Sequence, residues 1–428
     1  MLLQVGQLFI RSMDYKATLD YALELDAKDE LKGYRNQFHI PLQKNGEEHI
    51  YMCGNSLGLQ PKITKGFLNQ ELDDWAAYGV EGHFQAKNPW MPYHEFLTDS
   101  YARIVGAKPS EVVAMNTLTV NLHLMMVSFY RPTEKRYKII IEEDAFPSDI
   151  YAVESQIEYH GLSVSSSLVK LKARDGEASI RTEDITEILA KDQGEIALIM
   201  LGGVNYYTGQ VFDFEEITKI AHSKDIIVGF DLAHAAGNIK LELHKWGVDF
   251  AVWCSYKYLN SGPGSVAGAF IHEKHHYSNL PRFSGWWGHN KEDRFKMSNS
   301  FLPINTAEGW QLSNPPILSL AAIRASLSIF DEVGMDKLID KSQELTGYLV
   351  FLISSIKSQR VSIITPKERG CQLSIRVKNG DKKLFDMITS KGVVADWREP
   401  DVIRVAPVPL YNNFTDVFKF YIILKELL

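Results

Sequence analysis

The sequence of 428 residues has few cysteines, no long apolar run and no block of like charges. Cys53, Cys254 and Cys371 are far apart, cannot all pair and lack CxxC spacing, which argues against a disulfide framework or a zinc site and suits the reducing cytoplasm. No apolar run reaches the roughly 20 residues that a bilayer span needs. The formal charge of −7 is spread along the chain, which gives no reason to expect nucleic acid or a membrane as a partner. We therefore expect a small-molecule ligand.

Several familiar sequence signals are also missing. No GxGxxG motif follows an early strand, which argues against a nicotinamide oxidoreductase. We find no internal repeat and no low-complexity segment. The opening "MLLQVGQLFIRSM" lacks the basic start and the small-residue cleavage site of a targeting peptide. Because an amphipathic helical pattern begins at Met13, we expect residues 1–12 to be a dispensable extension.

The middle of the chain alternates between buried strands and helices. The stretches 136–144, 195–204 and 225–231 are rich in Ile, Val and Leu without polar alternation. Such continuous apolar runs are typical of parallel strands covered by helices on both faces. The pattern predicts a large α/β domain with a mostly parallel sheet.

The pattern changes near residues 313–317, "SNPPI", where two prolines oppose a helix before them and permit one after. A long helical stretch then follows, with a break at Gly334, two short strands and a closing helix. We predict three segments: an N-terminal segment, 1–60, that contributes to a small domain; a large domain, 61–316; and a C-terminal segment, 317–428, that completes a small α+β domain.

Two charged residues stand at the ends of consecutive predicted strands. Asp231 closes "IIVGFD", and Lys257 follows "AVWCSY" one β-unit later. Taken singly, Asp231 is more often a helix N-cap and Lys257 a solvated surface lysine. Carboxyl ends of parallel strands meet at one edge, however, where ligands bind. An acid and a lysine there fit pyridoxal 5'-phosphate, because the lysine forms a Schiff base and the acid holds the pyridine nitrogen protonated.

Other segments supply what this cofactor would need. "MNTLTVNLHLMM" predicts a polar turn that opens a helix, where the backbone amides near Leu118 and Thr119 could hold a phosphate. "EEDAFPSD" places Phe146 and Asp149 after another strand, where the aromatic ring could stack on the pyridine. Many helices begin with Asn or Thr, and a proline-bearing turn is an equal interpretation of the second segment.

Eight blocks in this order resemble kynureninase. They are "CGNSLGLQP" (53–61), "NTLTVNLHL" (116–124), "AFPSD" (145–149), "VGFDLAHAAGN" (228–238), "SYKYLNSGPG" (255–264), "GWWGH" (285–289), "SNPPI" (313–317) and "IRVAPVPLYN" (403–412). The resemblance runs from about residue 50 to the end. It implies a homodimeric pyridoxal phosphate enzyme of the aspartate aminotransferase fold type (fold type I) that hydrolyses L-kynurenine or 3-hydroxy-L-kynurenine to anthranilate or 3-hydroxyanthranilate and L-alanine, in tryptophan catabolism and NAD biosynthesis.

The resemblance also implies roles for individual residues. Lys257 would be the Schiff-base lysine, Asp231 the partner of the pyridinium nitrogen, and Tyr256 a proton carrier. Cofactor contacts would come from Leu118, Thr119, Phe146, Asp149, Gly202, His234, Tyr256, Trp286 and Asn314, with Trp286 and Asn314 reaching across the dimer interface. Arg404 would clamp the substrate α-carboxylate. A surface salt bridge is its alternative, although residues 405–408 offer no local acid.

Some points stay open within this resemblance. Gly202 stands where we expect relatives to offer Ser or Thr, so only a backbone amide could serve a phosphate there. His83, Ser313 and Asn314, as substrate contacts, resemble the eukaryotic form and favour the 3-hydroxylated substrate. The alternatives are a cysteine desulfurase or aminotransferase on the same scaffold, or a catalytically silent relative. A desulfurase needs a mobile nucleophilic cysteine, yet residues 255–370 contain none and Cys371 opens a predicted strand.

Overall fold

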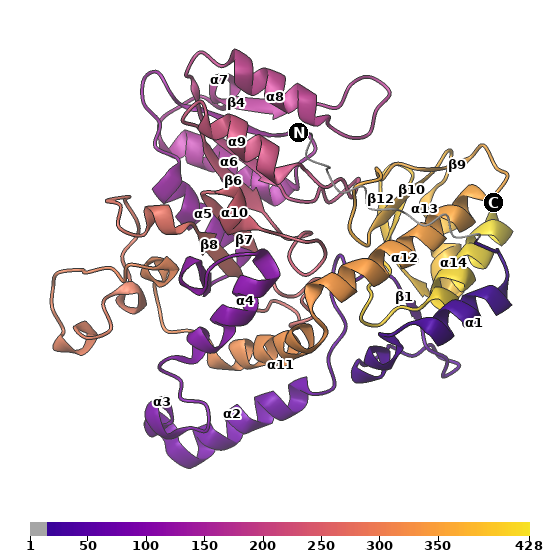
Figure 1. Ribbon diagram of the computed structural model, residues 1–428, viewed down its shortest axis with the longest axis horizontal. Helices are drawn as coiled ribbons and strands as arrows, with labels where there is room; N and C mark the ends of the chain where they lie inside the picture. Colours follow the sequence, from indigo (N-terminus) through magenta and orange to yellow (C-terminus); the bar gives the residue numbers. More distant parts are fainter. Residues whose placement is uncertain (1–14) are drawn as a thin grey trace, which may run out of the picture.

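The computed structural model describes residues 15–428, so the extension predicted for residues 1–12 lies outside the described residues. Figure 1 shows two lobes, a large one built on a central sheet and a smaller one that contains the C-terminus. Among the residues described, no helix is both long enough and apolar enough to cross a membrane.

The large lobe is built on a seven-stranded sheet that is mostly parallel, as predicted. In order across the sheet, the strands are β2 (Val112–Ala114), β8 (Gly268–Ile271), β7 (Phe250–Trp253), β6 (Ile227–Asp231), β5 (Ile196–Gly202), β3 (Lys138–Glu142) and β4 (Leu168–Leu171). Only β8 runs against its neighbours β7 and β2. The predicted strands at 136–144, 195–204 and 225–231 are confirmed as β3, β5 and β6, slightly shortened at their ends.

Helices cover both faces of this sheet. Alternate residues of each strand point to opposite faces. Ile139 and Leu198 join one apolar cluster with α5 (Leu118–Phe129) and α6 (Pro147–Tyr159), whereas Ile140 and Ile199 join the other with α8 (Thr182–Lys191) and α9 (Phe214–His222). Both side-chain sets are apolar because both faces are buried, which explains the continuous Ile, Val and Leu runs.

The remaining helices of the large lobe lie around this core. They are α2 (Thr64–Tyr78), α3 (Gly82–Gln85), α4 (Thr98–Val105), α7 (Val164–Ser167), α10 (Leu243–Trp246) and α11 (Ile317–Val333). Helix α11 packs against α2 and α4. It ends at Gly334, whose φ of +81° suits glycine, and α12 (Met335–Ser354) leads away into the small lobe. The break predicted at Gly334 is confirmed.

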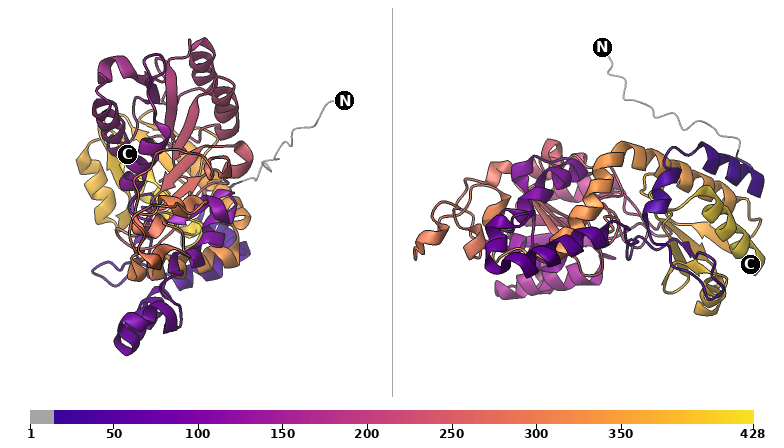
Figure 2. Two further views of the ribbon diagram at one scale, coloured as in Figure 1. Left: turned by 90° about the vertical axis from the view of Figure 1, so that its left-hand side faces the viewer. Right: turned by 90° about the horizontal axis from the view of Figure 1, so that it is seen from below.

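The small lobe joins the two ends of the described chain. Its four-stranded antiparallel sheet has the order β12 (Asp396–Arg398), β13 (Val402–Val405), β10 (Leu373–Val377) and β9 (Val361–Ile363). Strand β1 (Ile50–Tyr51) pairs with β11 (Val393–Val394), and α1 (Leu19–Lys28) packs on α14 (Phe414–Leu427), while α13 (Lys382–Ser390) also contacts α14. In the right-hand view of Figure 2, α1 (indigo) and α14 (yellow) lie at the end of this lobe that is farther from the large lobe.

Candidate active site

Four neighbouring strands of the large sheet end at one cavity. Lys257 follows β7, Asp231 ends β6, Gly202 ends β5 and Glu142 ends β3. Because parallel strands present their carboxyl ends at the same edge, residues that are far apart in the sequence become neighbours. The sequence prediction that Asp231 and Lys257 share a cavity is confirmed.

Nine residues predicted to contact the cofactor line this cavity. They are Leu118, Thr119, Phe146, Asp149, Gly202, Asp231, His234, Tyr256 and Lys257. Further lining residues that the sequence did not single out include Glu142, Ser148, Asn205 and Tyr206. Glu142 could have been noticed as an acid at the end of an apolar strand, whereas Tyr206 sits in a loop without any such signal.

Lys257 is surrounded by an imidazole and an aromatic ring. Its Nζ lies 3.1 Å from His234 Nε2 and 5.8 Å from the centre of the Phe146 ring. Burial, together with the nearby cations Lys257 and Arg404, lowers the pKa of His234 well below its ordinary value. The imidazole is therefore neutral, and if Nε2 accepts from the Lys257 side chain, its proton lies on Nδ1, a buried atom without a partner among the described residues.

Asp231 and Asp149 form a carboxyl pair beneath the cavity. Burial raises the pKa of both, and Asp231 raises that of Asp149 further through a direct side-chain contact. Lys257 opposes the effect at Asp231, whose Oδ1 also accepts the Ala233 amide at 2.6 Å. Two carboxyl groups in contact share a proton, so we assign the charge to Asp231 and the proton to Asp149. Asp231 is not a helix N-cap, because turns follow it.

Glu142 is a third buried carboxyl group at the same edge. Its Oε1 accepts the Gly202 amide at 3.0 Å, and its Oε2 is buried without a partner in residues 15–428. The Gly202 amide therefore already donates to Glu142 and is not free to bind a phosphate. This removes the phosphate contact that the sequence still allowed at Gly202. Burial, with a smaller contribution from Asp231, raises the pKa of Glu142 to about 8. Glu142 is therefore neutral at pH 7.

Replacing Glu142 should change how stability depends on pH. The folded state holds the Glu142 proton up to about pH 8, whereas the unfolded chain loses it near about 4.3. The free energy of unfolding therefore falls as pH rises through this window, by up to about 1.4 kcal/mol per pH unit. Glu142→Gln has no proton to lose, so the stability of the cofactor-free variant relative to wild type should rise by a few kcal/mol between pH 5 and pH 8.

Urea unfolding at pH 5, 6.5 and 8 measures this difference. Glu143→Gln is the matched control, because Glu143 is the next residue and forms an accessible ion pair with Lys172. The control should follow the wild-type slope. An equal slope in Glu142→Gln and wild type would show that Glu142 is ionised in the folded protein.

The cavity can hold a phosphate and a protonated heteroaromatic ring. Helix α5 begins at Leu118, and Thr117 before it makes no side-chain cap, so its first amides are available to an anion. Phe146 precedes Pro147 at the start of α6 and is 43% exposed, so its ring is accessible from the cavity. Burial raises the pKa of the Tyr256 phenol, which stays protonated. Together with Lys257 and the unpartnered Nδ1 and carboxyl atoms, these residues fit pyridoxal phosphate.

Five predicted residues lie outside this cavity in their own chain. Trp286 is 43% exposed and donates to the Arg294 carbonyl, while Ser313 and Asn314 are exposed. His83 contacts the Val80 carbonyl through Nδ1 at 2.9 Å. The fifth, Arg404, is 1% exposed and borders the cavity through the Tyr206 carbonyl, 2.5 Å from its Nη1. The sequence did not reveal the acid that pairs with Arg404, which is Asp396 on the neighbouring strand.

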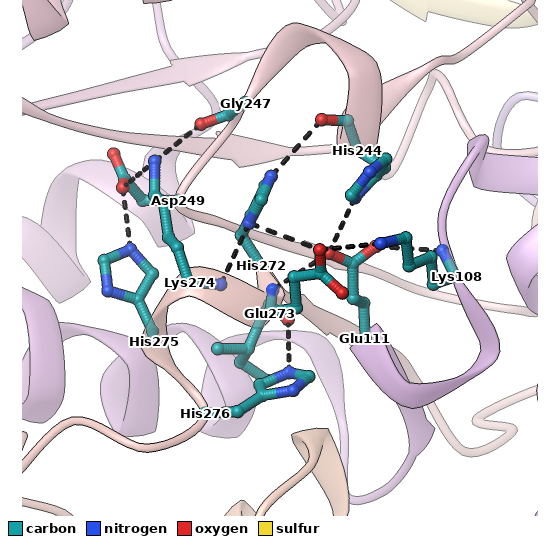
Figure 3. A network of polar contacts seen from close by, with 11 residues as sticks. Lys108, Glu111, His244, Gly247, Asp249, His272, Glu273, Lys274, His275 and His276 are labelled. Atoms are coloured by element: carbon teal, nitrogen blue, oxygen red, sulfur yellow. Dashed lines mark hydrogen bonds and ion pairs between the residues drawn. The ribbon is translucent and has the colours of Figure 1, made fainter.

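The opposite edge of the same sheet carries a second polar network, drawn in Figure 3. There the buried Glu111 contacts His244 Nδ1 at 2.9 Å and the Glu273 amide at 2.9 Å, and Asp249 binds two histidines and Lys274. Within the described chain, none of these residues leaves a buried polar atom unpartnered, unlike Glu142, Asp149 and His234. A network whose polar groups are all paired stabilises the fold, whereas unpartnered buried polar atoms around a cavity indicate a ligand-binding site.

Known proteins of similar fold bear out the predicted architecture. A cysteine desulfurase from Thermococcus onnurineus superposes with a TM-score of 0.77 over 92% of this chain and 97% of its own, at 17% identity. A mutant of C-DES with glycine covalently linked to its pyridoxal phosphate cofactor superposes with a TM-score of 0.77 at 14% identity, covering 92% of this chain and 99% of its own. At such identities the likeness concerns the fold alone, which is that of fold type I pyridoxal phosphate enzymes.

Sequence relatives identify the family. The chain is 57% identical over 410 residues to the kynureninase of Koribacter versatilis, covering 95% of this chain and 97% of the relative. It is 56% identical to that of Flavobacterium psychrophilum, covering 97% and 99%, and 55% identical to that of Myxococcus xanthus, covering 94% and 95%. Residues 338–424 match the family model of the kynureninase C-terminal domain. The chain belongs to the kynureninase family.

Proposed function

We propose that this protein hydrolyses the Cβ–Cγ bond of L-kynurenine or 3-hydroxy-L-kynurenine, releasing anthranilate or 3-hydroxyanthranilate and L-alanine. The observation that carries the proposal is identity above 50% with kynureninases along nearly the whole chain. The cavity supports it, because Lys257, Asp231, a free helix N-terminus and a buried arginine meet at one edge.

The reaction draws on pyridoxal phosphate, which when bound supplies an electron sink for the bonds broken at the substrate Cα and Cβ. Lys257 would hold the cofactor covalently through Nζ, and the same amine would serve as the base that takes the Cα proton of the substrate. Asp231 would hold the proton on the ring nitrogen. The neutral Asp149 adds no second charge beside Asp231.

Two further groups act on the substrate itself. Arg404 orients the α-carboxylate. Water adds to the γ-carbonyl carbon, and the Cβ–Cγ bond then breaks, leaving the acyl carbon as the aromatic acid and Cβ to take a proton. Tyr256 and Lys257 both line the cavity and would carry this proton, and the raised pKa of Tyr256 keeps its phenol able to donate. The two products together contain the atoms of the substrate and one water molecule.

The burial of the thiols argues against a cysteine desulfurase. Burial raises the pKa of Cys371 to about 12 and also raises those of Cys53 and Cys254. Cys371 is 1% exposed and contacts Tyr258. A nucleophilic thiolate needs the opposite environment, exposed and near a cation that lowers its pKa.

One assay tests the function. Purified protein supplied with pyridoxal phosphate and L-kynurenine should release fluorescent anthranilate and alanine in equal amounts. Formation of a keto acid with the pyridoxamine form of the cofactor would instead identify an aminotransferase. Absence of any product from both kynurenines would contradict the proposal.

We further propose that the enzyme is a homodimer whose active site is shared. Trp286, Phe295, Met297 and Leu302 expose large apolar side chains on one irregular segment, a composition typical of a protein contact. Trp286 and Asn314 would complete the partner's site. Light scattering should then give twice the mass of the 48.6-kDa chain, and a monomer at assay concentration would contradict the shared site.

His83, Ser313 and Asn314 do not line the cavity of their own chain, and Asn314 would reach the substrate ring from the partner. We propose that they favour the 3-hydroxylated substrate, which the ratio of kcat/KM values for the two kynurenines tests. A higher value for L-kynurenine would contradict this preference.

Two broader assignments complete the proposal. The three unpaired cysteines support action in the cytoplasm, where thiols stay reduced. We divide the chain at residues 60 and 316, with a small domain formed by both terminal segments, because α1 packs on α14 and β1 pairs with β11. Helix α11 then connects the domains while packing on the large one.

A further inference from the structure

Arg404 is held by a small group of charged residues outside the catalytic cavity. Strands β12 and β13 are antiparallel, and their register places Asp396 directly opposite Arg404. Asp396 Oδ2 accepts from Arg404 Nη2, from Arg398 Nη2 at 3.1 Å and from Ser56 Oγ at 2.8 Å. One carboxylate oxygen thus ties two guanidinium groups to the loop that contains Ser56.

The two anchors of Arg404 use two of the five N–H donors of its guanidinium. Nη1 donates to the Tyr206 carbonyl and Nη2 to Asp396, while Nε is buried without a partner in the part of the chain that the structure describes. A guanidinium has five N–H donors, so three remain, enough for a two-pronged contact with a carboxylate. Tyr206 lines the cavity, and its ring meets Phe146 edge-on at 5.3 Å. Arg404 is therefore fixed between the cavity wall and Asp396.

The charges of this group favour one incoming anion. Arg398 and Arg404 carry two positive charges, and Asp396 neutralises one of them. At 1% exposure, Arg404 alone would be a costly buried cation. With Asp396 and Arg398 the group keeps a net charge of +1, which matches a single carboxylate.

We propose that Asp396 is a positioning residue that fixes Arg404 for the α-carboxylate of an amino-acid substrate, while Arg398 balances Asp396 so that one positive charge remains for that carboxylate. This inference rests on the proposed function, since it assigns Arg404 to the substrate of that reaction. It assigns no direct substrate contact to Asp396.

The test is Asp396→Asn, which keeps the side-chain size but removes the charge. With L-kynurenine we expect KM to rise about 10- to 100-fold while kcat changes less than about threefold, because the arginine loses its orientation and not the chemistry. The dissociation constant of the product L-alanine, measured by calorimetry on the holoenzyme, should rise by a similar factor. Asp396→Glu should recover part of both losses.

Asp401→Asn is the matched control, because Asp401 lies in the same hairpin but faces Arg376, 3.5 Å away. Its KM and alanine affinity should equal those of wild type. A folded Asp396→Asn protein, with wild-type cofactor absorbance, whose KM and alanine affinity are unchanged would overturn the inference, as would a loss confined to kcat. If wild type binds alanine but does not cleave kynurenine, the proposed function is contradicted. The role of Asp396 is then still tested by the affinity for alanine.

Discussion

Lys257→Ala should abolish turnover, with kcat reduced at least about 10⁴-fold. The residue has two tasks, covalent attachment of the cofactor and proton transfer at the substrate Cα, and proton transfer by a positioned group alone contributes about 10²- to 10⁴-fold. Its Nζ faces the unprotonated His234 Nε2 at 3.1 Å, which holds the amine toward the cavity. An alanine at this position leaves no other lysine among the described residues that line the cavity.

Mass spectrometry after borohydride reduction gives a readout independent of activity. In wild type the peptide that contains Lys257 should gain the mass of the reduced cofactor, and in Lys257→Ala no peptide should. Lys240→Ala is the control, because Lys240 is an exposed lysine paired with Asp336; it should be labelled at Lys257 and retain full activity. A label on another lysine in wild type would move the covalent site elsewhere.

The site edge could be predicted from the sequence because its geometry follows from chain direction. Asp231 ends β6 and Lys257 follows β7, and these two strands are parallel neighbours in the sheet. The same reasoning places Gly202 and Glu142 beside them, since β5 and β3 follow in order. The direction of the strands alone brings their carboxyl ends together, so this prediction does not depend on how side chains pack.

Contacts that depend on side-chain packing or on hairpin register could not be predicted in this way. Residues 405–408 gave no acid for Arg404, yet Asp396 lies opposite it across a hairpin whose register the sequence does not reveal. Taken alone, the sequence favours a helix after Asp231, with that residue as its N-cap. Turns form there instead, because the Asp231 carboxylate binds the Ala233 amide and Gly237 adopts a φ of +78°.

Residues predicted to act across a dimer interface cannot be placed from the fold of one chain. Trp286 and Asn314 are exposed in their own chain, and a single chain offers no geometry against which to place them. Their assignment depends on the family resemblance, whereas that of Lys257 also follows from the fold. The oligomeric state therefore decides more about these residues than any contact within the chain.

Asp231→Asn should lower kcat by about 10²- to 10³-fold while the protein stays folded. A charge preorganised at a buried site stabilises the charge that develops during reaction, and removal of one such group costs about this much. The asparagine Oδ1 can still accept the Ala233 amide, so the turn should remain. We expect Asp149 not to take over, because burial, the largest cause of its raised pKa, persists in the variant.

The absorbance of the bound cofactor separates this loss from unfolding. Without a carboxylate opposite it, the ring nitrogen should lose its proton, and the spectrum of Asp231→Asn should differ from that of wild type at the same pH. Glu143→Gln is the matched control near the same sheet edge, because Glu143 does not line the cavity and pairs with Lys172, so its replacement leaves the charge beneath the cavity unchanged. It should keep the wild-type spectrum and kcat within about threefold. If Asp231→Asn also stayed within about threefold, the ring nitrogen would have to be paired with a different group, and Asp149, which contacts Asp231, would be the first to test.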